Sequence, residues 1–113
     1  MKDCSKDPKF IKADELAVSV YRDSESIPHE GGARMGGLRE QLREHAFSVP
    51  MFLMRGAQET QGRRRDRSEF VDMAQEEAIS ARYLVSVAGR LGLYPKYEET
   101  IERYTKLIVE LDE

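Results

Sequence analysis

LREQLREHAFSVPMFLMRGAQETQGRRRDR, residues 38–67, is the stretch that decides the fold. Its first two-thirds repeat apolar residues every three or four positions, which is the period of one face of an α-helix. Pro50 lies within this face, and a proline inside a helix costs about 3 kcal/mol. Because the apolar face continues on both sides of the proline, the pattern predicts a kinked helix from about Gly37 to Glu59 rather than a break. The face comprises Leu38, Leu42, Ala46, Val49, Leu53 and Ala57.

The same predicted helix carries a second apolar stripe. At about 100° per residue, Phe47, Met51 and Met54 project about 130° away from the first face, and Phe52 adds apolar surface on the other flank. A helix that is apolar on two sides is buried on two sides. In a chain this small, the second side most simply meets another subunit, so these four residues are the predicted oligomer interface. A wide core face within one chain is the alternative.

Three further helices are expected around this one. Residues 1–9 form a polar leader, predicted to be disordered, and Pro8 is expected to stop any earlier helix. A helical period then begins at Phe10 and is expected to end near Ser26, because Pro28 disfavours helical geometry at the residue before it. The apolar face of this first helix comprises Ala13, Leu16, Ala17, Val20 and Tyr21.

The second half of the chain predicts two more helices. Asp66 and Glu69 make a capping box at the start of one, and Gly92 suits the position that follows its last turn. Pro95 is expected at the first position of the last helix. That helix repeats Tyr97, Ile101, Tyr104, Ile108 and Leu111 along one seam. Residues 10–113 therefore predict a single all-α domain, an antiparallel up-down four-helix bundle.

Composition narrows the class of protein. The chain has 113 residues and a net charge of −3, spread as −2 over residues 1–33, +4 over residues 34–67 and −5 over residues 68–113. Cys4 is the single cysteine, which excludes an intrachain disulfide and a cysteine-based zinc site. There is no signal-peptide pattern and no apolar run of membrane-spanning length. These features predict a cytoplasmic protein that does not enter the membrane.

The basic segment is the strongest candidate for a binding site. Clustered guanidinium groups neutralise phosphates and give salt-dependent binding to nucleic acid. No aromatic residue alternates with these arginines, so base stacking is not predicted. The alternative is a solvated corner whose arginines pair with acidic residues of the last two helices or serve subunit contacts. The predicted nucleic-acid-binding residues are Arg55, Arg63, Arg64, Arg65 and Arg67.

Other chemistry has little support in the sequence. The glycine-rich residues 29–37 lack the strand and the Gly-Lys-Ser/Thr motif of a phosphate-binding loop, which favours an interhelical loop. No Glu-x-x-His motif occurs, and no metal site, cofactor or catalytic set is predicted. Glu77 falls within the apolar stripe of the third helix, and His45 flanks that of the second. Since a buried carboxylate needs a partner, these two are predicted to form a buried polar pair.

The order of motifs resembles that of the small bacterial four-helix-bundle proteins found in intervening sequences of large-subunit ribosomal RNA genes. The resemblance runs from about Phe10 to Leu111 and rests mainly on Ser48-Val49-Pro50, with Gly56 and a basic turn after it. Further markers are Val20-Tyr21, Ile27-Pro28, Leu38-x-x-Gln41-Leu42-Arg43, Glu69-Phe70, Ala74 and Ala88-Gly89-Arg90-Leu91-Gly92-Leu93. The chain departs from the family at 52–56, where Phe-Leu-Met-Arg-Gly replaces the usual Asn-Ile-Ala-Glu-Gly, and near Glu76-Glu77, where the usual Gly-Ser pair is missing.

This resemblance implies an up-down bundle that assembles into a homopentamer. Relatives of the family include accessory proteins of diversity-generating retroelements, which bind a reverse transcriptase and nucleic acid. The favoured hypothesis is thus a non-enzymatic oligomer that presents its basic corner to RNA, DNA or a nucleic-acid-bound protein such as a reverse transcriptase. The alternative is an assembly or scaffold module without nucleic-acid binding, and an enzyme comes third.

Overall fold

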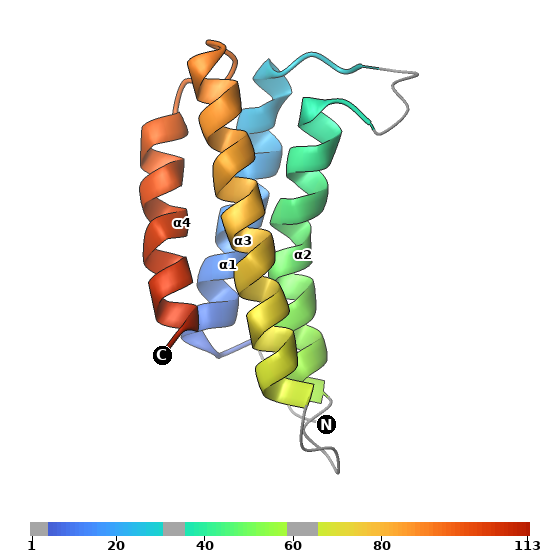
Figure 1. The fold of residues 1–113 in the computed structure, drawn as a ribbon, viewed down its shortest axis with the longest axis vertical. Coiled ribbons are helices and arrows are strands. Elements are labelled where there is room, and N and C mark those ends of the chain that lie inside the picture. Colours follow the sequence, from blue (N-terminus) through green and yellow to red (C-terminus); the bar gives the residue numbers. More distant parts are fainter. Residues whose placement is uncertain (1–4, 31–35, 59–65) are drawn as a thin grey trace.

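The computed structural model describes residues 5–30, 36–58 and 66–113, with the backbone alone for 66–68. It contains four α-helices, α1 (Pro8–Asp23), α2 (Leu38–Gln58), α3 (Asp66–Arg90) and α4 (Tyr97–Leu111). A short 3₁₀ helix, η1 (Ser24–Ser26), follows α1, and the described residues contain no strand. Figure 1 shows the four helices side by side along the long axis of the molecule. The all-α, four-helix prediction is confirmed.

The first helix begins two residues earlier than predicted. Pro8 occupies its first turn, and the Asp7 carboxylate accepts a hydrogen bond of 3.0 Å from the Lys9 amide. Proline tolerates this position because its missing N–H would have no partner in the first turn. Pro8 therefore opens the helix instead of stopping one, and the expected leader at 1–9 shortens accordingly; residues 1–4 lie outside the described part of the chain.

Helix α2 runs without interruption through Pro50, and its bounds agree with the prediction within one residue at each end. Pro50 itself is buried, together with Leu42, Ala46, Val49 and Gly56. Burial of this face on both sides of the proline supplies the stability that offsets the lost backbone hydrogen bond.

The turn between α3 and α4 confirms one prediction and corrects another. Gly92 has φ +74°, and the amides of Gly92 and Leu93 donate to the carbonyls of Gly89 and Ala88 at 3.0 and 2.9 Å. This pair of bonds is a Schellman motif. Pro95, however, does not open α4, which begins at Tyr97. The Tyr97 amide instead donates to the Tyr94 carbonyl at 3.2 Å, so the proline sits inside a tight turn.

The core lies where small residues on α3 let the other helices approach closely. Gly89 marks a close approach between α3 and α4, since a Cβ built there would lie 2.6 Å from Tyr97 Cβ and closer still to two carbons of the Tyr97 ring. The loops also contribute, because Ile27 and Tyr94 are buried. The buried apolar residues are Ala13, Leu16, Ala17, Val20, Ile27, Leu42, Ala46, Val49, Ala74, Ala78, Ala81, Val85, Ala88, Tyr94, Tyr104, Leu107 and Leu111.

Candidate functional site

The arginine corner falls largely outside the described residues. This holds for Arg63, Arg64 and Arg65 and for the side chain of Arg67, whose backbone lies in the first turn of α3. Arg55 is described and exposed near the end of α2. Its guanidinium carbon lies 5.0 Å from the centroid of the Phe70 ring, a cation–π distance. Arg55 is therefore held toward α3, the helix that carries Arg67.

Phe52 was predicted to belong to the oligomer interface together with Phe47, Met51 and Met54, but it does not share their exposure. Its ring is partly buried and stacks on Phe70 of α3 with a centroid separation of 6.3 Å. The physical reason is its direction on the helix, because Phe52 projects on the α3 side of α2 while the other three residues project on the α1 side. Phe52 is a packing residue between two helices of one chain.

The other three stripe residues are exposed and continue onto α1. Met51 is 55% exposed, and Phe47 and Met54 are each 37% exposed. The Phe47 ring contacts Tyr21 of α1 at a centroid separation of 5.9 Å. Ile11 and Val18 share the side of α1 that carries Tyr21, because residues separated by three or seven positions line one face. Both are exposed as well. We name this set, Ile11, Val18, Tyr21, Phe47, Met51 and Met54, the α1–α2 apolar surface.

Tyr21 is fixed at the edge of this surface by Arg43. The guanidinium carbon of Arg43 lies 4.0 Å from the Tyr21 ring centroid. The same side chain donates to the Tyr21 carbonyl at 3.0 Å, to Ser24 Oγ at 2.8 Å and to Glu25 Oε1 at 3.0 Å. The prediction that Tyr21 faces the core is wrong, since it is held outward in a defined position, which lowers the entropic cost of using it in a contact.

His45 and Glu77 lie together as predicted. His45 Nδ1 and Glu77 Oε1 are 2.7 Å apart across α2 and α3. Their side chains are 34% and 26% exposed, so the pair lies at the edge of the core and not within it. The prediction of contact is confirmed and that of burial is wrong, because Glu77 lies toward the rim of the α3 stripe, next to the α2 surface.

Replacing Glu77 with Gln is expected to cost less than about 1 kcal/mol of unfolding free energy, because water reaches this partly exposed hydrogen-bonded pair. Urea denaturation at pH 7 measures the loss, with Glu76→Gln as the matched control on the exposed side of the same helix. A loss above about 3 kcal/mol would indicate a desolvated pair and contradict this placement.

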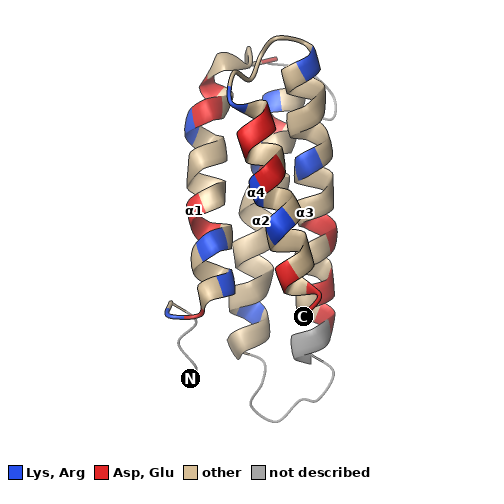
Figure 2. Cartoon of the chain, turned by 90° about the vertical axis from the view of Figure 1, so that its left-hand side faces the viewer, with Lys and Arg blue, Asp and Glu red and all other residues tan. Residues whose placement is uncertain are grey.

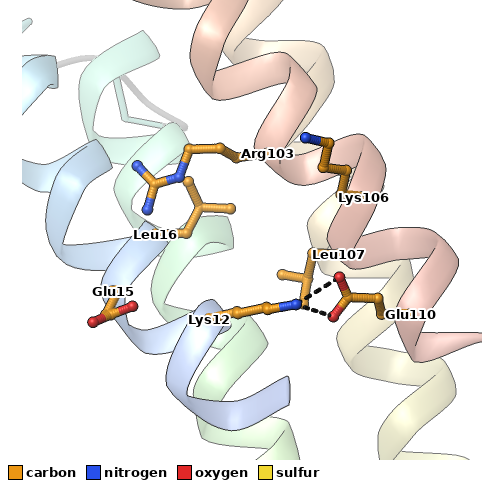
Figure 3. Close-up of a pocket in the computed structure, with 7 residues that line it drawn as sticks. All are labelled: Lys12, Glu15, Leu16, Arg103, Lys106, Leu107 and Glu110. Atoms are coloured by element: carbon orange, nitrogen blue, oxygen red, sulfur yellow. Dashed lines mark hydrogen bonds and ion pairs between the residues drawn. The ribbon is translucent and has the colours of Figure 1, made fainter. Parts of the chain in front are cut away.

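A cleft of about 270 Å³ lies between α1 and α4. Leu16 and Leu107 line it from the core, and Lys12, Glu15, Arg103, Lys106 and Glu110 line its remaining sides. Figure 3 shows the Arg103 side chain reaching from α4 toward α1 above Leu16, with Lys12 reaching the opposite way to Glu110. In Figure 2, α4 carries both acidic and basic residues along the side that faces the viewer, next to α1. Sequence patterns did not single out this cleft, because its residues come from the two ends of the chain.

Two tyrosines, one in the turn before α4 and one on α4, are buried. The Tyr94 hydroxyl lies 3.3 Å from Thr100 Oγ1, and burial raises the pKa of Tyr94 to about 12. Burial also raises the pKa of Tyr104, whose hydroxyl has no hydrogen-bond partner among the described residues. Both hydroxyls are therefore protonated at neutral pH and serve packing.

Within the part of the chain that the structure describes, no group of three or more His, Cys, Asp and Glu side chains is arranged to hold a metal ion. Of the described helices, none combines the length and apolarity needed to span a membrane. Comparison of the chain with protein-family models and with curated proteins gives no match.

Proposed function

We propose that this protein is a non-enzymatic, self-assembling helical bundle whose copies join through the α1–α2 apolar surface. The exposure of this surface carries the proposal. Six large apolar side chains lie on one side of two neighbouring helices, and apolar surface of this kind marks a contact site. Mutual burial of such side chains is favourable by about 25 cal/mol per Å² of apolar area.

A second apolar surface supports a head-to-tail contact. Ile79 and Tyr83 are exposed one turn apart on α3, and Tyr83 is 62% exposed. With Leu84, they line a shallow depression between α2 and α3 that also includes His45. Two different apolar surfaces on one chain favour a heterologous contact, in which the α1–α2 surface of one copy meets the α2–α3 depression of the next. Such contacts repeat around a closed ring.

The antiparallel up-down arrangement and the fivefold ring complete the assembly proposal. The order of contacts supports the first, since Phe52 pairs with Phe70 and His45 with Glu77, so that one residue number falls as the other rises. Likewise, Lys12 bonds Glu110 and Ser19 bonds Arg103. The number of copies in the ring rests on the resemblance to the intervening-sequence bundles.

We further propose that the ring binds nucleic acid, or a protein bound to it, through the arginine corner. Four of residues 63–67 are arginine, within the segment of the chain whose charge is +4. Arg55 and the backbone of Arg67 lie near the ends of α2 and α3 that flank this segment. A ring would repeat the corner in each copy and multiply its attraction for phosphates. Assembly without nucleic-acid binding is the competing proposal.

The Arg63→Ala, Arg64→Ala, Arg65→Ala variant is expected to bind structured RNA and duplex DNA more weakly. Each lost phosphate contact lowers the salt-dependence slope on duplex DNA by about 0.9, so three lower it by about 2.7. Fluorescence anisotropy at two or more salt concentrations measures both quantities. Arg82→Ala, Arg90→Ala is the control, which removes two cations elsewhere on α3. Equal binding by the triple variant and the original chain would contradict the proposal that these arginines bind nucleic acid. No binding by either would favour assembly without nucleic-acid binding.

A further inference from the structure

We propose that the cleft between α1 and α4 binds a small amphipathic carboxylate, with its carboxylate on Arg103 and its alkyl chain over Leu16 and Leu107. This site is independent of the assembly proposal, because it lies on the α1–α4 side of the bundle. No lining residue of the cleft belongs to the α1–α2 apolar surface or to the α2–α3 depression, and Val18 of the α1–α2 apolar surface lines a neighbouring depression together with Arg103.

Arg103 is the residue best prepared to bind an anion. The other two cations of the cleft already have carboxylate partners, since Lys12 bonds Glu110 at 2.8 Å and Lys106 bonds Glu102 at 3.2 Å. Among the described residues, no carboxylate lies within ion-pair distance of Arg103. One of its terminal nitrogens instead donates to Ser19 Oγ at 3.1 Å. The Ser19 bond orients the guanidinium and leaves most of its five N–H groups for a ligand.

A planar guanidinium held in this way matches the two oxygens of a carboxylate. The bond to Ser19 limits the rotation of the side chain before the ligand arrives, which reduces the entropy lost on binding. Lys12 and Lys106 are each paired with a carboxylate, and the Glu15 side chain points away from the opening in Figure 3. Arg103 is thus the cation of the cleft that no carboxylate of the described residues neutralises, which favours an anion there.

The walls of the cleft favour a ligand with a short apolar part. Leu16 and Leu107 line it from the core, and the methylene groups of Lys12, Arg103 and Lys106 add apolar surface beneath their charged ends. A bare inorganic anion would leave these groups uncovered. The volume of about 270 Å³ falls just below the usual range for ligand pockets, which begins at about 300 Å³, so the ligand is small.

Methyl NMR spectroscopy with sodium hexanoate tests the site. We expect saturable shifts of the Leu16 and Leu107 methyl signals, with a Kd of about 1 mM for so small a ligand. Hexylammonium, which has the same chain and the opposite charge, is expected to shift neither signal. Acetate and inorganic phosphate are expected to bind at least about tenfold more weakly than hexanoate, because neither covers the apolar walls.

The residue that carries the site is tested in the same titration. Arg103→Gln is expected to raise the Kd for hexanoate about tenfold or more, the effect of losing a charge-assisted hydrogen-bond pair. Arg103→Lys, which keeps the charge without the planar fork, is expected to fall between the two. Arg82→Gln, which replaces a partly buried arginine of α3 bonded to Thr105, is the control and should leave the Kd unchanged. Equal shifts with hexylammonium, phosphate binding as tight as hexanoate, absent saturation, or an unchanged Kd in both Arg103 variants would each overturn the proposal.

Discussion

The Met51→Glu, Met54→Glu variant is expected to run as a single chain of 13.0 kDa where the original protein runs as an assembly. Both methionines project from the α1–α2 apolar surface, so the substitution leaves the core of the bundle untouched. In the assembled state, each new carboxylate would be moved from water into an apolar contact without a partner. This costs several kcal/mol for each charge, enough to dissociate an ordinary subunit contact. Light scattering coupled to size-exclusion chromatography measures the mass.

Val109→Glu is the matched control for this result. Val109 is a large, exposed apolar residue of α4, outside both proposed contact surfaces, and its substitution should leave the mass unchanged. An equal loss of mass in the control would mean that added negative charge, and not the site, dissociates the assembly. An unchanged mass in the double variant would show that Met51 and Met54 do not lie in the subunit interface.

Mixing two variants distinguishes a head-to-tail contact from a symmetric one. Ile79→Glu, Tyr83→Glu disrupts the α2–α3 depression and leaves the α1–α2 surface intact. Each double variant alone should be a single chain, whereas the mixture should form a pair of about 26 kDa, twice the chain mass of 13.0 kDa. A mixture that remains at the mass of one chain would contradict the heterologous arrangement.

Gly89→Ala is expected to destabilise the bundle by about 1–3 kcal/mol, the usual cost of overfilling a packed core. This sign is opposite to the helix preference of alanine, which exceeds that of glycine by about 1 kcal/mol. The reason is the Tyr97 side chain, which occupies the space that the new methyl group needs. Thermal or urea denaturation measures the change.

The same substitution in a Tyr97→Ala background provides the control for this second prediction. With the ring removed, the methyl group has room, and Gly89→Ala should become neutral or stabilising. The coupling between the two changes then measures the steric conflict. A destabilisation of the same size in both backgrounds would show that Tyr97 is not its cause.

The sequence predicted the helices well because their signals are local. Apolar periodicity predicted the bounds of α2, the Asp66 capping signal predicted the start of α3, and Gly92 with Leu93 formed the turn predicted after it. The contact between His45 and Glu77 was also predictable, since both lie on the facing sides of consecutive helices. The predictions for Pro8 and Pro95 were wrong, because a proline suits both a first helical turn and a tight turn. Only the surrounding hydrogen bonds decide between them.

What the sequence could not predict depends on how the helices lie against one another. A periodic pattern does not tell a face that meets the same chain from one that meets solvent, so Phe52 and Tyr21 exchanged roles. The seam of five residues predicted for α4, spaced alternately by four and three, also omitted the buried Thr100 and Leu107, because a straight helix drifts away from a repeat of 3.5 residues. The cleft around Arg103 could not be predicted from local patterns, because it forms only where α1 and α4, from opposite ends of the chain, pack together.

The solution mass of the unmodified protein tests the central claim most directly. Light scattering over a hundredfold range of concentration should give a constant multiple of the 13.0 kDa chain mass, about 65 kDa for the proposed ring of five. Another constant multiple would support self-assembly but with a number of copies other than five. A mass of 13.0 kDa at every concentration would contradict the account, because the α1–α2 apolar surface would then have no partner copy.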